Sequence, residues 1–175
     1  MKIAVLGYSG AVKSTLARQM SRRLAIPCLH LDQVHWLPGW VERNREESRQ
    51  MVQDFLDRNS SWVIDGSYPA LCCEQRLEQA DRIVILALPR LQCLWRAWRR
   101  SVQYRGRARA DMTEGCPEKF DREFLRWLLW EGRSKARREV FRDISRRWPE
   151  KTVFCRSSRQ AAALTEQLAG NGPIE

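Results

Sequence analysis

A glycine-rich segment near the start of the chain has the residue types that bind phosphate. Residues 7–15 read Gly-Tyr-Ser-Gly-Ala-Val-Lys-Ser-Thr and lie between an apolar run and a helical pattern. This context and spacing are typical of the P-loop (Walker A motif), in which backbone N–H groups at a helix start surround phosphates. We expect Lys13 to be a catalytic cation and the Ser14 hydroxyl to be a ligand of Mg²⁺. The nucleotide-binding set is Gly7, Tyr8, Ser9, Gly10, Ala11, Val12, Lys13, Ser14 and Thr15; the alternative is an ordinary glycine turn.

One position of this segment departs from the motif. Val12 stands where the motif G-x-x-x-x-G-K-[ST] has its second glycine. If the loop needs a positive φ there, a β-branched residue is among the least suitable. Either the valine impairs nucleotide binding, or the loop relaxes slightly and binds more weakly.

Two acidic residues follow predicted strands and are candidates for chemistry. Asp65 ends the apolar run Trp62–Asp65, and we expect it to hold the waters of Mg²⁺. Asp32 ends the run Pro27–Asp32 and can orient an acceptor hydroxyl, bind its phosphate or assist the metal. His35 follows in the loop and can line the acceptor pocket. For both acids the alternative is a turn cap, and for His35 it is a structural role.

Several arginines have positions suited to anionic ligands. Arg96 and Arg100 are four residues apart, so they share a helix face and can reach the nucleotide. Arg133 and Arg137 form a second such pair, which we expect to act as catalytic lid arginines. Arg43 and Arg76 are candidates for clamping the acceptor. The alternative for these arginines is a solvated basic face.

Apolar runs alternate with helical patterns along the chain. Unbroken apolar runs suit strands that are covered on both faces, and this alternation predicts an α/β fold with a parallel sheet between two helical layers. The predicted strands are Lys2–Leu6, Pro27–Asp32, Trp62–Asp65, Arg82–Leu88 and Lys151–Arg156. The predicted helices are Ser14–Leu24, one that starts after Asn44, Leu71–Ala80, Leu91–Tyr104, Glu118–Trp130, Arg133–Trp148 and Arg159–Leu168, the last capped by Ser158; residues 105–121 are predicted to be a mobile loop.

Composition limits the classes of protein. The 175 residues carry a net charge of +10, and residues 90–150 hold +8 of it, with 17 Lys and Arg against 9 Asp and Glu. This basic segment is either a set of solvated helix faces or a cleft for nucleotide phosphates or nucleic acid. The six cysteines lack a C-x-x-C pair, so we expect free thiols in a reducing cytoplasm and no zinc site. No apolar run is long enough to span a membrane.

Tryptophans recur at helical spacing within this basic segment. Such a pattern can make a stacking surface for single-stranded nucleic acid. Packing in the core of a small lid subdomain explains it equally simply, and we favour that interpretation. The residues are Trp95, Trp98, Trp127, Trp130 and Trp148.

The chain resembles the nucleoside monophosphate kinase group of P-loop NTPases and, more narrowly, the bacterial DNA topology modulation (FlaR-like) proteins. The resemblance rests on the P-loop and on Leu29–Asp32 with His35 and Trp36, Val63–Gly66, and Tyr104–Gly106 through Gly115–Asp121. It implies an adenylate-kinase-like three-layer sandwich with a five-stranded parallel sheet and a closing lid. We therefore expect a single domain over residues 1–175, with a basic helical lid at about 100–148.

The function that fits these features is a phosphotransferase with ATP and Mg²⁺ as cofactors. Its partners would be the nucleotide and a small-molecule acceptor, which can itself be a nucleotide; the oligomeric state stays open. The alternative is a regulatory module, impaired by Val12, that binds a nucleotide or a nucleic acid.

Overall fold

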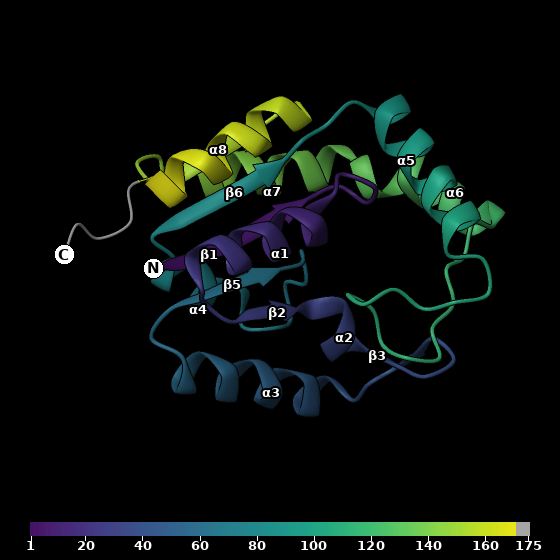
Figure 1. The fold of residues 1–175 in the computed structure, drawn as a ribbon, viewed down its shortest axis with the longest axis horizontal. Helices are drawn as coiled ribbons and strands as arrows, with labels where there is room; N and C mark the ends of the chain where they lie inside the picture. Colours follow the sequence, from purple (N-terminus) through teal and green to yellow (C-terminus); the bar gives the residue numbers. More distant parts are fainter. Residues whose placement is uncertain (171–175) are drawn as a thin grey trace.

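A parallel sheet forms the centre of the molecule (Figure 1). The computed structural model describes residues 1–170. Its five main strands have the order β2-β5-β1-β6-β7, and every neighbouring pair is parallel. These strands are β1 (Lys2–Gly7), β2 (Cys28–His30), β5 (Trp62–Asp65), β6 (Arg82–Leu86) and β7 (Thr152–Cys155). The predicted five-stranded sheet is therefore confirmed.

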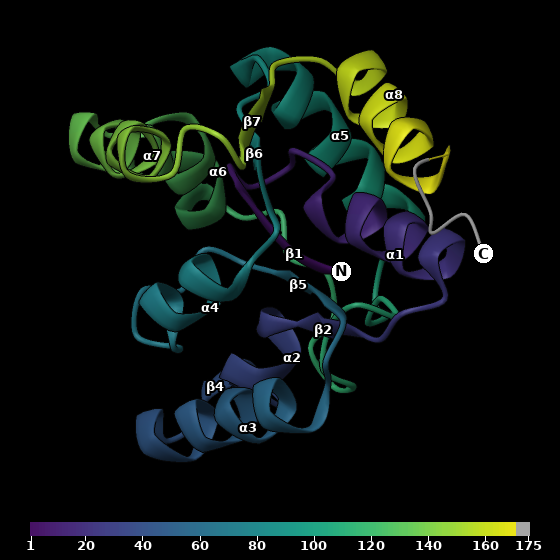
Figure 2. The same cartoon turned by 90° about the vertical axis from the view of Figure 1, so that its left-hand side faces the viewer.

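Helices cover both faces of this sheet, as Figure 2 shows. One layer consists of α1 (Lys13–Leu24), α5 (Arg90–Gln103) and α8 (Ser158–Gly170), and α6 (Arg122–Leu129) adds to it. The opposite layer consists of α2 (Leu31–His35), α3 (Arg45–Arg58), α4 (Cys73–Gln79) and α7 (Lys135–Arg147). A short 3₁₀ turn, η1 (Glu131–Arg133), joins α6 to α7.

The alternation of side chains along β1 explains the two layers. Ile3 and Val5 belong to the core shared with α1, whereas Ala4 and Leu6 belong to the core on the other face. All four are buried, because successive residues of a strand point to opposite faces. The central strand is thus apolar throughout and carries the glycine-rich loop at its carboxyl end.

Most predicted helices are present within a few residues, and Asn44 caps α3 by accepting from the N–H groups of Glu46 and Glu47. Two details of the sequence-based prediction are wrong. The second strand ends at His30, because residues 31–35 form the short helix α2. The cap of α8 is the Ser157 hydroxyl, which accepts from the N–H of Gln160 at 3.2 Å.

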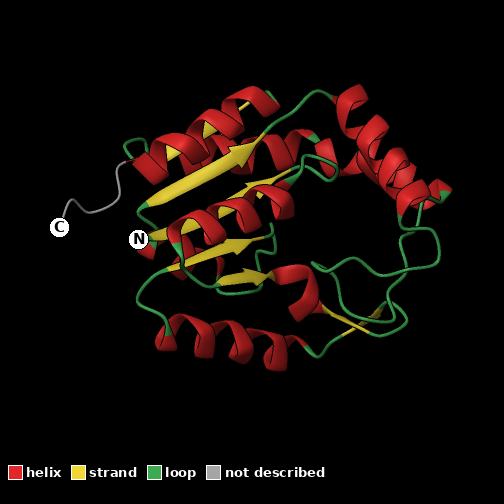
Figure 3. Cartoon of the chain, viewed as in Figure 1, coloured by secondary structure: helices red, strands yellow, loops and turns green. Residues whose placement is uncertain are grey.

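A small hairpin and a long loop close one end of the molecule (Figure 3). Strands β3 (Trp36–Leu37) and β4 (Val41–Glu42) pair antiparallel, and neither was predicted from the sequence. Residues 105–121 contain no helix or strand, as predicted, but the loop is docked on this hairpin. The N–H of Gly39 donates to the Gly115 carbonyl at 2.9 Å, and the Thr113 hydroxyl donates to the Trp36 carbonyl at 2.7 Å.

Within residues 1–170, none of the helices combines the length and the apolar character needed to cross a bilayer.

Candidate functional site

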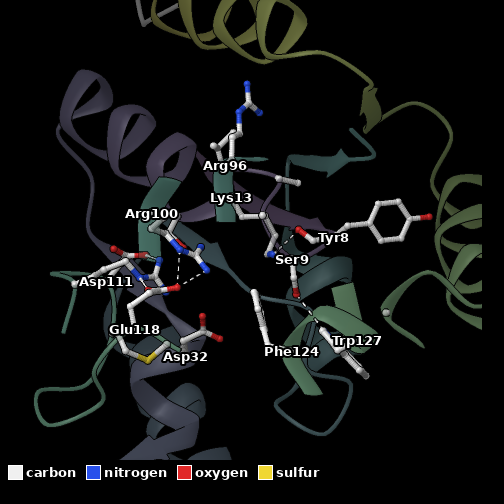
Figure 4. Close-up of a pocket in the computed structure, with 18 of the residues that line it drawn as sticks. Tyr8, Ser9, Lys13, Asp32, Arg96, Arg100, Asp111, Glu118, Phe124 and Trp127 are labelled. Carbon is white, nitrogen blue, oxygen red and sulfur yellow. Dashed lines mark hydrogen bonds and ion pairs between the residues drawn. The ribbon is translucent and has the colours of Figure 1, made fainter. Parts of the chain in front are cut away.

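A cavity of about 980 Å³ lies at the carboxyl ends of the strands. Ligands of open parallel sheets bind at this edge. All nine residues of the glycine-rich loop line the cavity, together with side chains from α5, α6 and loop 105–121 (Figure 4). Residues that are far apart in the sequence therefore meet around one space, large enough for a nucleotide-sized ligand.

The glycine-rich loop packs closely against α5 and is bridged by Lys13. Gly10 has φ +74°, and a Cβ there would come within 2.5 Å of the Cys93 carbonyl oxygen of α5. The Lys13 ammonium donates to the Tyr8 carbonyl at 3.1 Å, so its side chain folds back over the loop. Burial lowers the pKa of Lys13, and the charges of Asp32 and Asp65 oppose that shift. A bound polyanion would relieve the same penalty.

Val12 adopts the conformation that makes it a poor substitute for glycine. Its φ is 58° and its ψ is 27°, a left-handed conformation at the position that precedes α1. A β-branched residue is strained there, and such strain costs roughly 1–3 kcal/mol. The left-handed turn at Val12 leads directly into α1, with the N–H of Leu16 donating to the Val12 carbonyl at 3.0 Å.

Asp32 reaches the cavity with one carboxylate oxygen already engaged. The Tyr68 hydroxyl donates to its Oδ1 at 2.6 Å. Burial, together with the charge of Asp32, raises the pKa of Tyr68, so the phenol stays protonated as a donor. Both residues line the cavity, and the second oxygen of Asp32 stays available to a ligand.

Asp65 does not line the cavity. It is buried at the end of β5, where Nδ1 of His30 forms a short hydrogen bond to its Oδ1. Burial alone would lower the pKa of His30, but its bonds to Asp65 and Cys28 outweigh this effect and raise it to about 10. The histidine is therefore charged at neutral pH. It binds the carboxylate of Asp65, which the sequence suggested as a partner of Mg²⁺.

Three of the predicted arginines line the cavity. Arg96 projects from α5 and donates to the Ser158 hydroxyl. Arg137 donates to the Ser67 carbonyl at 3.4 Å, and its guanidinium lies 5.3 Å from the centre of the Trp127 ring. Arg100 lines the cavity as well, but it is paired with Glu118 of loop 105–121 at 2.6 Å.

The other predicted arginines do not line the cavity. Arg133 is buried, donates to the Leu88 carbonyl at 2.9 Å and covers the Tyr8 ring at 4.1 Å, so it supports the glycine-rich loop from behind. Arg76 is fully buried and donates to the carbonyls of Leu71 and Tyr68.

Two more candidates are held by other residues of the chain and do not face the cavity. Arg43 donates to the Val34 carbonyl at 2.9 Å and pairs with Glu47, so its cation is already in use. The His35 ring packs against Trp36 and Tyr68, each with ring centres 4.7 Å apart. Neither residue lines the cavity, in contrast to their predicted role in contacting the acceptor.

The structure adds a set of charged residues that the sequence analysis did not single out. Ion pairs of 2.6–2.9 Å run from Arg18 to Asp111, on to Arg109, then to Glu118 and to Arg100. We call these five residues the arginine–carboxylate chain. Although burial opposes it, Arg109 lowers the pKa of Asp111, with help from the Ser14 hydroxyl. A sequence signal was present, since residues 82–110 contain eight arginines and no acid, and Asp111 is the first acid after them.

The tryptophans of the basic segment are more exposed than expected. Trp95, Trp98 and Trp130 are each at least half exposed, and only Trp148 packs against a core cluster. The prediction that these rings pack in the core of a lid is therefore wrong for most of them. Trp127 has a different role, because its indole N–H donates to the Ser9 hydroxyl at 3.1 Å and joins α6 to the glycine-rich loop.

The cavity offers oxygen donors suited to Mg²⁺. This ion commonly takes only one or two protein ligands and completes its shell with phosphate oxygens and water. Ser14 and Asp32 both line the cavity and have the hard oxygen atoms that Mg²⁺ prefers. The donor set therefore fits a Mg²⁺ ion that arrives with a nucleotide.

The chain has an α/β fold in which a glycine-rich loop follows the central strand of a five-stranded parallel sheet. Solved structures of kinases have a similar fold. A shikimate kinase from Acinetobacter baumannii in complex with shikimate has a TM-score of 0.56 and 17% identity over 95% of this chain and 89% of its own. A gluconokinase from Sinorhizobium meliloti has a TM-score of 0.53 and 17% identity over 97% and 94%.

An uncharacterized protein from Eubacterium ventriosum has a TM-score of 0.55 and 13% identity over 98% of this chain and 99% of its own. No protein-family model and no curated protein matches the sequence. At these identities the similarity shows the fold, which is that of P-loop kinases.

Proposed function

We propose that the protein is a Mg²⁺-dependent phosphotransferase that moves the γ-phosphoryl group of ATP to a hydroxyl of a small molecule. The observation that carries this proposal is the meeting of the glycine-rich loop, Lys13 and Asp32 in one cavity of about 980 Å³. The P-loop kinase fold of the similar structures supports it. The narrower resemblance to DNA topology modulation proteins rests on sequence segments alone.

Each group of residues in the cavity would have its own role in the reaction. The N–H groups of the loop and Lys13 would hold the outer phosphates, and Arg96 and Arg137 would neutralise charge on them. Mg²⁺, held by Ser14 and the phosphates, would polarise the transferred group. Asp32 would accept the proton of the acceptor hydroxyl while a new phosphorus–oxygen bond forms and the bond to ADP breaks. The loop 105–121 would exclude water.

Acceptor-dependent ADP formation tests this proposal. Purified protein with Mg·ATP should release little ADP alone, and more when a panel of small alcohols and nucleosides includes its acceptor. Asp32→Asn should abolish the acceptor-dependent part, whereas Asp54→Asn, on the exposed face of α3, should leave it unchanged. No ADP above background with any acceptor, although Mg·ATP binds, would count against a kinase.

A second candidate function is a nucleic-acid-binding module. Trp95 and Trp98 are half exposed on α5, within the acid-free residues 82–110 that carry eight arginines. Exposed aromatic rings among arginines can stack on single-stranded bases. Binding of a single-stranded oligonucleotide without Mg·ATP, with a steep salt dependence and loss in Trp95→Ala, would favour this function.

A further inference from the structure

Asp111 brings a carboxylate to the start of α1 from a distant part of the chain. It belongs to loop 105–121, lines the same cavity as Ser14 (Figure 4) and is buried, with 4% of its surface exposed. Arg18 of α1 donates to its Oδ1 at 2.9 Å. Because residues four apart share a helix face, Arg18 and Ser14 lie on the same side of α1. The carboxylate therefore lies beside the hydroxyl that would bind Mg²⁺.

The Ser14 hydroxyl is a hydrogen-bond partner of this carboxylate. Burial would raise the pKa of Asp111, but the charge of Arg109, the hydrogen bond of Ser14 and the charge of Arg18 together lower it. An ionised carboxylate has no proton to donate, so the hydroxyl is the donor in this bond. A hydroxyl has one proton and two lone pairs. With its proton directed at Asp111, the Ser14 oxygen keeps its lone pairs for a metal ion.

The ion pairs of Asp111 leave room for this bond and fix the carboxylate in place. Each oxygen of Asp111 takes one guanidinium, Arg18 at 2.9 Å and Arg109 at 2.8 Å. An ionised carboxylate accepts about four hydrogen bonds, so it can bind Ser14 in addition to both arginines.

The two acids at the strand ends are engaged in other contacts. Asp65 does not line the cavity, and a histidine binds its carboxylate. Asp32 lines the cavity, and the Tyr68 hydroxyl donates to its Oδ1 at 2.6 Å. Neither contact orients the Ser14 hydroxyl. That task is open to Asp111.

We infer that Asp111 is a positioning residue of the Mg²⁺ site, which accepts the hydrogen bond of the Ser14 hydroxyl and thereby turns the Ser14 oxygen toward the ion that arrives with the nucleotide. Since Asp111 reaches α1 from loop 105–121, docking of this loop and binding of the metal are coupled. This inference rests on the proposed function and adds a residue to its metal site.

Binding of ADP with and without Mg²⁺ tests the inference without turnover. Calorimetric titration of the full chain gives the affinity for Mg·ADP and the affinity for ADP in the presence of a chelator, and their ratio is the effect of the metal. Asp111→Ala should lower this ratio about tenfold or more, because residues that orient a metal ligand contribute about tenfold to a hundredfold. A residue that only holds the loop together would change both affinities alike, and an unchanged ratio overturns the inference.

Glu118→Gln is the matched control for a loosened loop. It weakens the ion pairs of Glu118 with Arg100 and Arg109, but both guanidinium partners of Asp111 stay in place. The ratio should therefore stay at the wild-type value, even if both affinities change. An equal fall of the ratio in Glu118→Gln and Asp111→Ala would make loop docking responsible and overturns the inference.

A double variant shows whether Asp111 acts through Ser14. Ser14→Ala removes the hydroxyl, so it should lower the ratio at least as much as Asp111→Ala. Both substitutions together should lower it no further than Ser14→Ala alone, since residues within one interaction are not additive. A fall equal to the product of the single effects overturns the inference.

The unaltered chain gives a measurement that does not depend on the folding of a variant. In a crystal with Mg·ADP, the Ser14 hydroxyl should stay within hydrogen-bond distance of Asp111, and a carboxylate turned away from Ser14 overturns the inference.

The titrations keep this result separate from the proposed function. If Mg·ADP binds and Asp111→Ala keeps the wild-type ratio, the function stands and the inference fails. If the ratios change as expected but no acceptor is phosphorylated, the function fails and the position of Asp111 stands. If ADP binds under neither condition, both fail.

Discussion

The donor end and the acceptor end of the cavity are built in different ways. The donor end comes from one continuous segment, residues 7–15, whose shape is set by a strand, a turn and the first turn of α1. The acceptor end is assembled from the β3–β4 hairpin, the segment after β5 and loop 105–121. Under the proposed function, phosphate binding would depend on local structure, whereas acceptor selection would depend on tertiary contacts.

Loss of the Lys13 ammonium should have the largest effect on the donor end. Lys13→Ala removes a cation that would stabilise charge on the transferred phosphate, and kcat/KM should fall by about 10²–10³. ADP release with a saturating acceptor measures the change. Lys151→Ala should keep the wild-type rate, because its ammonium binds the Glu78 carbonyl on the surface. Equal rates in both variants would show that the loop does not hold the reacting phosphate.

Substitution of the two arginines of one predicted pair, Arg133 and Arg137, should have different effects on stability and on kcat. Arg133→Met leaves the Leu88 carbonyl without its buried donor, so unfolding should become easier by about 2 kcal/mol. Arg137→Met should change the free energy of unfolding by less than about 0.5 kcal/mol but lower kcat by about tenfold to a hundredfold. Denaturant titration and steady-state kinetics give the two numbers. Equal changes in stability and in kcat for both variants would contradict a structural role for Arg133 and a role in the reaction for Arg137.

The sequence predicts the place of the glycine-rich loop, between a strand and a helix, for a physical reason. The glycine-rich loop lies between its own strand and helix, so neighbouring residues determine its shape. The five main strands were also predictable, because unbroken apolar runs such as Ile83–Leu86 require cover on both faces.

The acceptor end could not be predicted in the same way. Glu118 and Arg109 meet Arg100 only because loop 105–121 docks on the β3–β4 hairpin. Their local sequence does not encode that docking. For the same reason, Arg43 and Arg76 were expected in the acceptor pocket, although backbone carbonyls hold both of them elsewhere.

Relief of backbone strain at Val12 should have a moderate effect on fold stability and on nucleotide binding. Val12→Gly should stabilise the fold by about 1 kcal/mol and raise the thermal midpoint by about 2–4 °C, with tighter binding of Mg·ATP. Ala25→Gly is a matched control, since Ala25 has φ 52° at the other end of α1. It should raise the midpoint without changing nucleotide affinity. Weaker nucleotide binding in Val12→Gly would contradict the role assigned to strain.

The His30–Asp65 pair should give an effect that is visible as a pH dependence of stability. The pKa of His30 rises from 6.5 to about 10 on folding, so the charged pair stabilises the fold fully below pH 6.5. That stabilisation is lost as the pH rises through about 10. Denaturant titrations across this range should show a fall in stability that is shallower in His30→Gln. His35→Gln should keep the wild-type slope, and a shallow slope in the wild type would contradict the assignment.

A crystal structure with Mg·ADP tests the central claim most directly. We predict that the β-phosphate lies within the loop of residues 7–15, with Lys13 released from the Tyr8 carbonyl and turned toward the phosphate oxygens. A nucleotide bound elsewhere, or a loop that stays empty at saturating Mg·ADP, would contradict it.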